Sequence, residues 1–178
     1  MKFVSVLGAI RKGIDTLNDY VGRFAKYILL VILFCLSFEV IARYGFNSPT
    51  IWAQDISRQA LCALGALGGG YTMLYNQHVR VDVFYGSWSD KTKAIVDICT
   101  CSLYLLFMIL LVYQTVISCI DSWTFNERAA TVFAPPLYYI KTIIPIGAVL
   151  ILLQAVSNLI HDIQTLVTGK SEGLRTIE

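Results

Sequence analysis

The stretch NQHVRVDVF, residues 76–84, holds the side chains best suited to chemistry: His78, Arg80 and Asp82. The histidine could act as a base, the aspartate as an acid and the arginine as an anion binder. No nucleophile is marked nearby, and a lone histidine does not make a metal site. His78 directly follows nineteen uncharged residues, 59–77. The favoured interpretation is a polar segment at a membrane edge that contacts headgroups or a neighbouring protein.

The composition indicates what surrounds this stretch. Of 178 residues, 56% are hydrophobic and 15% are charged, whereas soluble domains have about 45–50% apolar and about 25% charged residues. The apolar residues come in long blocks, as in a small integral membrane protein. The net charge is only +2, and no basic run is interleaved with aromatic residues, so a nucleic-acid partner is not expected.

The apolar blocks predict an all-α integral membrane protein with one membrane domain, residues 1–178. Four membrane-spanning helices are expected at about residues 24–44, 57–77, 94–118 and 138–161. Residues 1–22 have apolar side chains at helical spacing and predict an amphipathic helix on the membrane surface; the alternative is an arm that packs on a partner. Ser48 followed by Pro49 predicts the start of a short interfacial helix. Residues 162–178 form a polar tail.

The basic residues predict the orientation. Ten Lys and Arg residues lie before the first span or at its start, between the second and third spans, or after the fourth. Four, Arg43, Arg58, Arg128 and Lys141, lie in the other two loops or at the span ends beside them. The positive-inside rule therefore places both termini in the cytoplasm, with His78 at the cytoplasmic exit of the second span.

Small and charged residues indicate where the predicted spans contact one another or a partner. Gly65, Gly69 and Gly70 follow the spacing that lets two helix backbones approach closely. Glu39 and Arg43 lie four residues apart, on one helix face, as an interfacial ion pair or a contact to an external partner. No acidic residue lies at the centre of a span and no internal repeat is present, which indicates that this chain needs a partner to move a substrate.

The order of the motifs resembles a known family. ARYGFNSPTIWAQDISRQ is followed by a glycine-rich span, by HVRVDVF and by IKTIIPIGAVLILLQ. This order is similar to that of the small membrane subunit, the DctQ-like Q subunit, of tripartite ATP-independent periplasmic (TRAP) transporters. The resemblance implies a transporter of the bacterial inner membrane in which a periplasmic solute-binding protein captures an organic acid. It also implies a large membrane subunit that carries the substrate by sodium-coupled, elevator-like movement, while the small subunit acts as a scaffold.

The resemblance assigns roles to matching residues. It implies that Arg43, Trp52 and Asp55 contact the binding protein, although a single Asp55 stands where some members have two adjacent acids. His78 and Asp82 match an H-x-x-x-D motif, so with Arg80 they are expected to contact the large subunit or the membrane edge. The expected partners are these two proteins and membrane lipids. The chain itself is not expected to be an enzyme or to hold a cofactor or metal.

Two other functions stay open. One is a free-standing membrane adaptor or assembly protein, which would need no binding protein. The other is a cysteine-based membrane oxidoreductase, suggested by the five cysteines Cys35, Cys62, Cys99, Cys101 and Cys119. The absence of a C-x-x-C spacing argues against the oxidoreductase.

Overall fold

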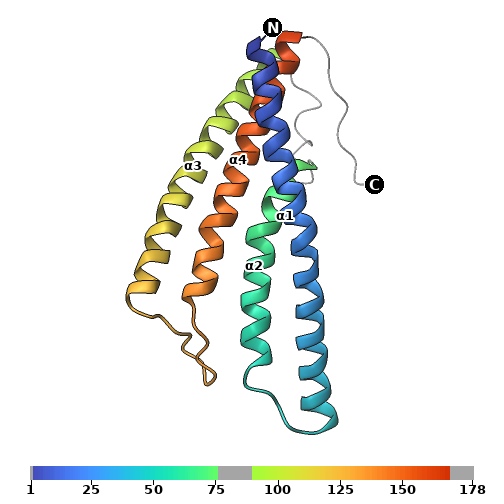
Figure 1. Ribbon diagram of the computed structural model, residues 1–178, viewed down its shortest axis with the longest axis vertical. Coiled ribbons are helices and arrows are strands. Elements are labelled where there is room, and N and C mark those ends of the chain that lie inside the picture. The colour runs from blue at the N-terminus through green and yellow to red at the C-terminus, as the bar shows by residue number, and fades with distance from the viewer. Residues whose placement is uncertain (1, 76–89, 169–178) are drawn as a thin grey trace.

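The computed structural model describes the backbone of residues 2–75 and 90–168, and the side chains of residues 8–75, 100 and 102–160. The described elements are helices α1 (Lys2–Val40), α2 (Ala53–Leu74), α3 (Asp90–Thr124) and α4 (Tyr138–Thr168), with a short π-helix η1 (Ile41–Gly45) after α1. The α1–α2 and α3–α4 connections lie together at one end of the molecule, here called the loop end (Figure 1). The opposite end, where α1 begins and α4 ends, is called the terminal end.

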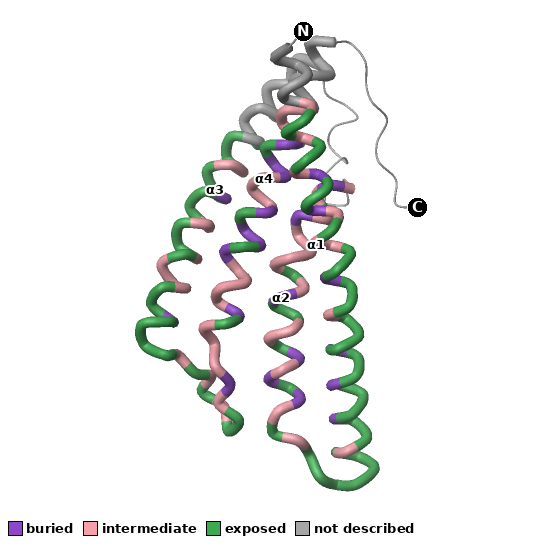
Figure 2. The backbone as a smooth tube through the Cα atoms, in the orientation of Figure 1, coloured by how far each residue is buried: buried purple, intermediate pink, exposed green. Residues whose placement is uncertain are grey.

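The helices are arranged as a fan in the order α1, α2, α4, α3. Helix α2 packs on both α1 and α4, and α3 packs on α4, while α1 also meets α4. The α1–α4 contact lies toward the terminal end, and the α1–α2 and α3–α4 pairs diverge toward the loop end (Figure 1). Burial follows this arrangement, because the outward sides of α1 and α3 are largely exposed (Figure 2).

Three of the four predicted spans are matched by helical segments that are long and apolar enough to cross a membrane. Among the described residues, these segments are Gly8–Gly45, Ser102–Thr124 and Tyr138–Ile160. Helix α2 does not join them, since four glycines and the polar Arg58 and Gln59 lower its mean hydropathy. The all-helical class of membrane protein is thus confirmed, while the fourth span stays a prediction.

The N-terminal segment differs from the separate surface helix that was predicted. Helix α1 runs without a break for 39 residues, about 58 Å, and joins the amphipathic residues 2–22 to the first apolar span. The reason lies in tertiary contacts: Asp15 and Asn18 are buried and bond to side chains of α4. These contacts hold the amphipathic segment against the bundle.

The predicted short helix at Ser48 and Pro49 is also absent from the described loop, because α2 begins only at Ala53. The end of α1 and the following η1 supply the acceptors for the loop's backbone amides instead. The Ser48 amide donates to the Ala42 carbonyl oxygen over 2.9 Å, and the Thr50 amide donates to Glu39 Oε2 over 3.0 Å. Because these backbone donors already have acceptors, a further helical turn before Ala53 is not required to satisfy them.

Candidate functional site

A buried carboxylate organises the loop end. Glu39 is 7% exposed and lies in the last turn of α1. Its Oε1 accepts from Arg43 Nε over 3.0 Å and from Nη2 over 2.5 Å, and its Oε2 accepts from the backbone amide and the hydroxyl of Thr50. Four donors therefore compensate for the removal of this charge from water.

Arg43 is the part of this cluster that reaches the surface. It belongs to η1, whose π-helical turn follows directly on α1, and π-turns frequently occur at functional sites. Half of the Arg43 side chain, 49%, is exposed, against 9% for Glu39. Glu39 thus holds the guanidinium in one orientation while leaving much of it accessible to a partner.

Trp52 and Asp55 make mainly internal contacts. The Trp52 ring stacks on Phe38 of α1 with centroids 5.6 Å apart. Asp55 is buried, and its Oδ2 accepts from the Thr131 hydroxyl over 2.6 Å. Its Oδ1 lies 3.8 Å from Arg58 Nη1, an ion pair in which Arg58 is largely exposed. Asp55 therefore ties the start of α2 to the α3–α4 loop, and Arg58 carries the accessible charge.

The α3–α4 loop has a defined shape of its own. Leu137 and Ala129 donate backbone bonds to Glu127 and Pro135, both over 2.9 Å. The Lys141 ammonium bonds to the Glu127 carboxylate and lowers the pKa of this carboxyl below its ordinary value. This hairpin-like loop holds Thr131 beside Asp55.

Aromatic rings mark the junction of this loop with its helices. Trp123, Tyr138 and Tyr139 contact one another, and Trp123 Nε1 donates to the Thr142 hydroxyl over 2.9 Å. Such amphipathic rings are enriched at the boundary between lipid and water.

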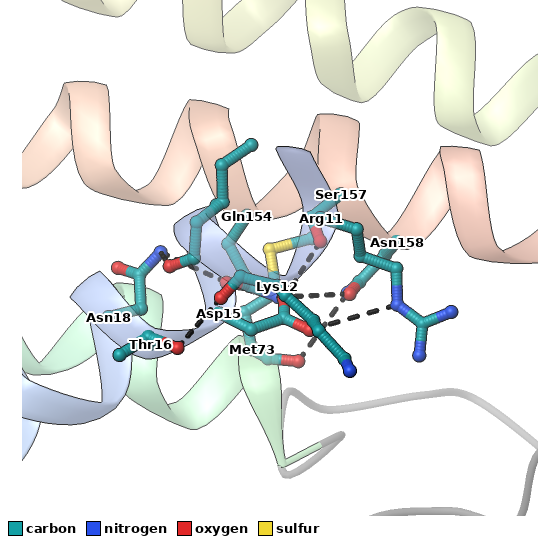
Figure 3. Close-up of polar contacts among 10 residues, drawn as sticks. Arg11, Lys12, Asp15, Thr16, Asn18, Met73, Gln154, Ser157 and Asn158 are labelled. Carbon is teal, nitrogen blue, oxygen red and sulfur yellow. Dashed lines mark hydrogen bonds and ion pairs between the residues drawn. The ribbon is translucent and has the colours of Figure 1, made fainter. Parts of the chain in front are cut away.

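A second polar cluster lies toward the terminal end (Figure 3). Asp15 Oδ1 accepts from Gln154 Nε2 over 3.1 Å and from the Ser157 hydroxyl over 2.8 Å. Asn18 Nδ2 donates to Gln154 Oε1 over 2.9 Å, and Asn158 Nδ2 donates to the Met73 carbonyl oxygen over 3.5 Å. We call this set the terminal-end network. It links α1 to α4 through nearly fully buried groups, and α4 to α2 through the half-buried Asn158.

The sequence interpretation missed this network, although it left a signal. Asp15 and Asn18 are three residues apart, and Gln154, Ser157 and Asn158 follow one helix face inside an apolar segment. Polar side chains at that spacing within a predicted span favour hydrogen bonding between helices.

The predicted packing glycines divide into two groups. A Cβ at Gly70 would collide with the Asn18 side chain, and one at Gly69 would lie 2.5 Å from Ile151 Cδ1. Gly65, by contrast, is exposed and has open space at its Cβ position. Gly147 of α4, which sequence reasoning did not single out, meets the backbone of Ala66. Close helix contacts inside the chain thus use Gly69, Gly70 and Gly147.

The remaining predicted site residues, His78, Arg80 and Asp82, lie outside the described residues. In the described part of the chain, no group of three His, Cys, Asp or Glu side chains could hold a metal ion. Cys35, Cys62 and Cys119 are free thiols on three different helices.

The fold and the two polar clusters define the class: a small helical membrane protein whose polar groups gather toward its two ends. The sequence model of the protein family described as the DctQ component of tripartite ATP-independent periplasmic transporters matches residues 30–165. This match covers most of the chain, so the protein belongs to the DctQ family, and the resemblance seen in its motifs is confirmed. The family supplies the small membrane subunit of TRAP transporters. No individual curated protein matches the chain.

Proposed function

We propose that this DctQ-family chain is a non-catalytic subunit of a sodium-coupled TRAP transporter that imports an organic acid. In this role it supports the large membrane subunit and helps to dock the periplasmic solute-binding protein. Family membership carries the proposal. Substrate and sodium binding are assigned to the partner proteins.

The docking role is supported by Arg43. Its side chain is half exposed, and its guanidinium is held by the buried carboxylate of Glu39. The neighbouring Arg58 and Arg128 are also exposed, so the loop end offers several cations to a partner with acidic groups. Charges arranged in this way steer association and raise its rate more than they raise final affinity.

The scaffold role is supported by the exposed apolar sides of α1 and α3. We include α2 as a fourth span, because its 22 residues extend about 33 Å against a hydrocarbon thickness of about 30 Å. Helix α2 packs between α1 and α4, so it needs less apolar surface than a helix surrounded by lipid. With four spans and the positive-inside rule, both termini are cytoplasmic and the loop end is periplasmic.

Co-purification tests the proposal. The chain is expressed together with candidate large-subunit and solute-binding-protein genes from the same genome, with an affinity tag on the small subunit. We expect the large subunit to purify with it. A small subunit that purifies alone while the large subunit transports at full rate without it would support the free-standing adaptor instead.

A photocrosslinking residue tests the docking role separately. We place the crosslinker at Tyr44, which is exposed beside Arg43, and a control crosslinker at Leu106, which is exposed midway along α3. The binding protein is expected to crosslink to position 44 and not to position 106. Equal crosslinking at both positions would argue against docking at the loop end.

A further inference from the structure

Helix α3 carries an amide side chain deep inside its apolar segment. Gln114 lies twelve residues after the start of Ser102–Thr124 and ten residues before its end. Trp123, one of the aromatic rings at the loop-end boundary, follows nine residues later, about 14 Å along the helix. Because half of the hydrocarbon thickness is about 15 Å, Gln114 lies close to the middle of the membrane.

The Gln114 amide has no hydrogen-bond partner among the described residues, and its side chain is exposed. The neighbouring Thr115 differs, because its hydroxyl donates to the Leu111 carbonyl oxygen of its own helix over 2.8 Å. A glutamine amide has two N–H donors and an acceptor oxygen, and lipid tails can satisfy none of them. A polar group of another protein at the same depth would satisfy them.

Gln114 lies on a side of α3 that is open to such a protein. Helix α3 is at the edge of the fan and packs mainly on α4 (Figure 1). Its buried residues Met108 and Ser122 lie about a quarter to a third of a turn around the helix from Gln114. The outward side of α3 is exposed along its described length (Figure 2).

The residues in line with Gln114 follow a heptad spacing, in which steps of four and three residues alternate. They are Leu103, Phe107, Leu110, Gln114, Ile117 and Asp121, all exposed except the half-buried Ile117. We call this set the α3 seam. Two helices that cross at about 20° pack along seams of this spacing, and one polar residue within a seam fixes which residues meet.

We propose that the α3 seam binds a membrane helix of the large subunit. The Gln114 amide hydrogen-bonds to a polar side chain of that helix near the middle of the membrane, and Asp121 meets a donor or a cation of the partner near the loop-end boundary. This proposal rests on the proposed function, because it takes the large membrane subunit as the partner. It adds the face of this chain that the large subunit covers and the chemistry of the contact.

Charge argues against a second copy of this chain as the partner. Copies insert in the same orientation, so a symmetric dimer through the α3 seam would place its two Asp121 side chains at the same height. Like charges placed opposite each other disfavour such a contact. A different membrane protein can supply a complementary group, and the DctQ family is a component of a tripartite transporter.

The variant Gln114→Leu tests the contact. Fluorescence energy transfer between labelled small and large subunits in proteoliposomes gives the dissociation constant of the pair. We expect Gln114→Leu to weaken association by about threefold to tenfold, since the partner's polar group loses its hydrogen bond. The melting temperature of the small subunit alone should not fall, because Gln114 bonds to no described residue.

The matched control is Gln54→Leu, the same substitution at an exposed glutamine in the first turn of α2, and it should leave association unchanged. Leucine is more favourable than glutamine against lipid tails. Equal or tighter association of Gln114→Leu would therefore show that Gln114 faces lipid, and this would overturn the proposal while leaving the proposed function intact. An unaltered chain that does not bind the large subunit would overturn both.

Photocrosslinking identifies the partner. Leu110 of the α3 seam and its neighbour Ile109 are 57% and 55% exposed at nearly the same depth, but they point about 100° apart around the helix. A crosslinker at position 110 should capture the large subunit, and one at position 109 should capture it less. Crosslinking from position 110 to a second copy of this chain would overturn the proposed partner.

Discussion

Two of the buried carboxylates in the described part of the chain, Glu39 and Asp15, are bonded in opposite ways. At the loop end, Glu39 is bonded by residues four and eleven positions away, Arg43 and Thr50. At the terminal end, Asp15 is bonded by residues 139 and 142 positions away, Gln154 and Ser157. The first arrangement orients an exposed guanidinium locally, and the second joins helices from opposite ends of the chain. A buried carboxylate can therefore either orient an exposed side chain or hold helices together. The distance along the chain to its hydrogen-bond partners shows which of the two it does.

This comparison predicts that Asp15→Ala destabilises the protein most. Gln154 and Ser157 would lose a buried acceptor, which should cost about 2–3 kcal/mol of stability. Thermal denaturation of the detergent-solubilised chain measures the loss. Asp19→Ala is the control, since Asp19 is more exposed and should cost less than about 1 kcal/mol. Equal losses for both variants would mean that the terminal-end network does not hold the helices together.

A second prediction uses a pair of glycines on α2. Gly70→Ala places a methyl group against Asn18, so Asn18 must move away from Gln154, with a loss of about 1–3 kcal/mol. Gly65→Ala meets open space and should be neutral or stabilising by up to about 1 kcal/mol, because alanine favours a helix. The same thermal denaturation measures the stability of both variants. The reverse order would show that Gly65 makes the closer contact.

The third prediction, at the loop end, separates the role of Arg43 in docking from its contribution to the stability of the fold. Arg43→Ala should lower uptake by about tenfold at limiting binding protein, because a surface charge mainly affects the association rate. Saturating binding protein should restore most of the uptake. The melting temperature should also fall, because the buried Glu39 loses two of its four hydrogen-bond donors. Uptake into proteoliposomes at both concentrations provides the measurement. Arg128→Ala is the control at the same end, and an equal effect there would indicate general attraction rather than a role of Arg43.

Different parts of the structure were predictable to different degrees. Apolar runs predicted the helical class and three spans well, because lipid requires long helices with satisfied backbones. The Glu39–Arg43 pair was also predictable, since it depends only on helical spacing. The bonds of Asp15 and Asp55 depend on which distant segment each helix meets, and spacing along one helix holds no such information. The same limit explains why the N-terminal amphipathic pattern predicted a surface helix rather than the start of a continuous α1.

The smallest expected effect concerns the α3–α4 loop, where Lys141 lowers the pKa of Glu127. A carboxyl with a lowered folded-state pKa stabilises the fold above its unfolded pKa and loses this contribution as pH falls through the folded value. Lys141→Gln should therefore cost a small amount of stability at neutral pH, and this difference from the unaltered chain should vanish as pH falls below about 4.3. Thermal denaturation at several pH values between neutral and acidic measures this difference in stability. Asp15→Ala is measured in the same way as the reference for a large loss. A large loss for Lys141→Gln at neutral pH would show that the loop end, like the terminal end, holds the helices together.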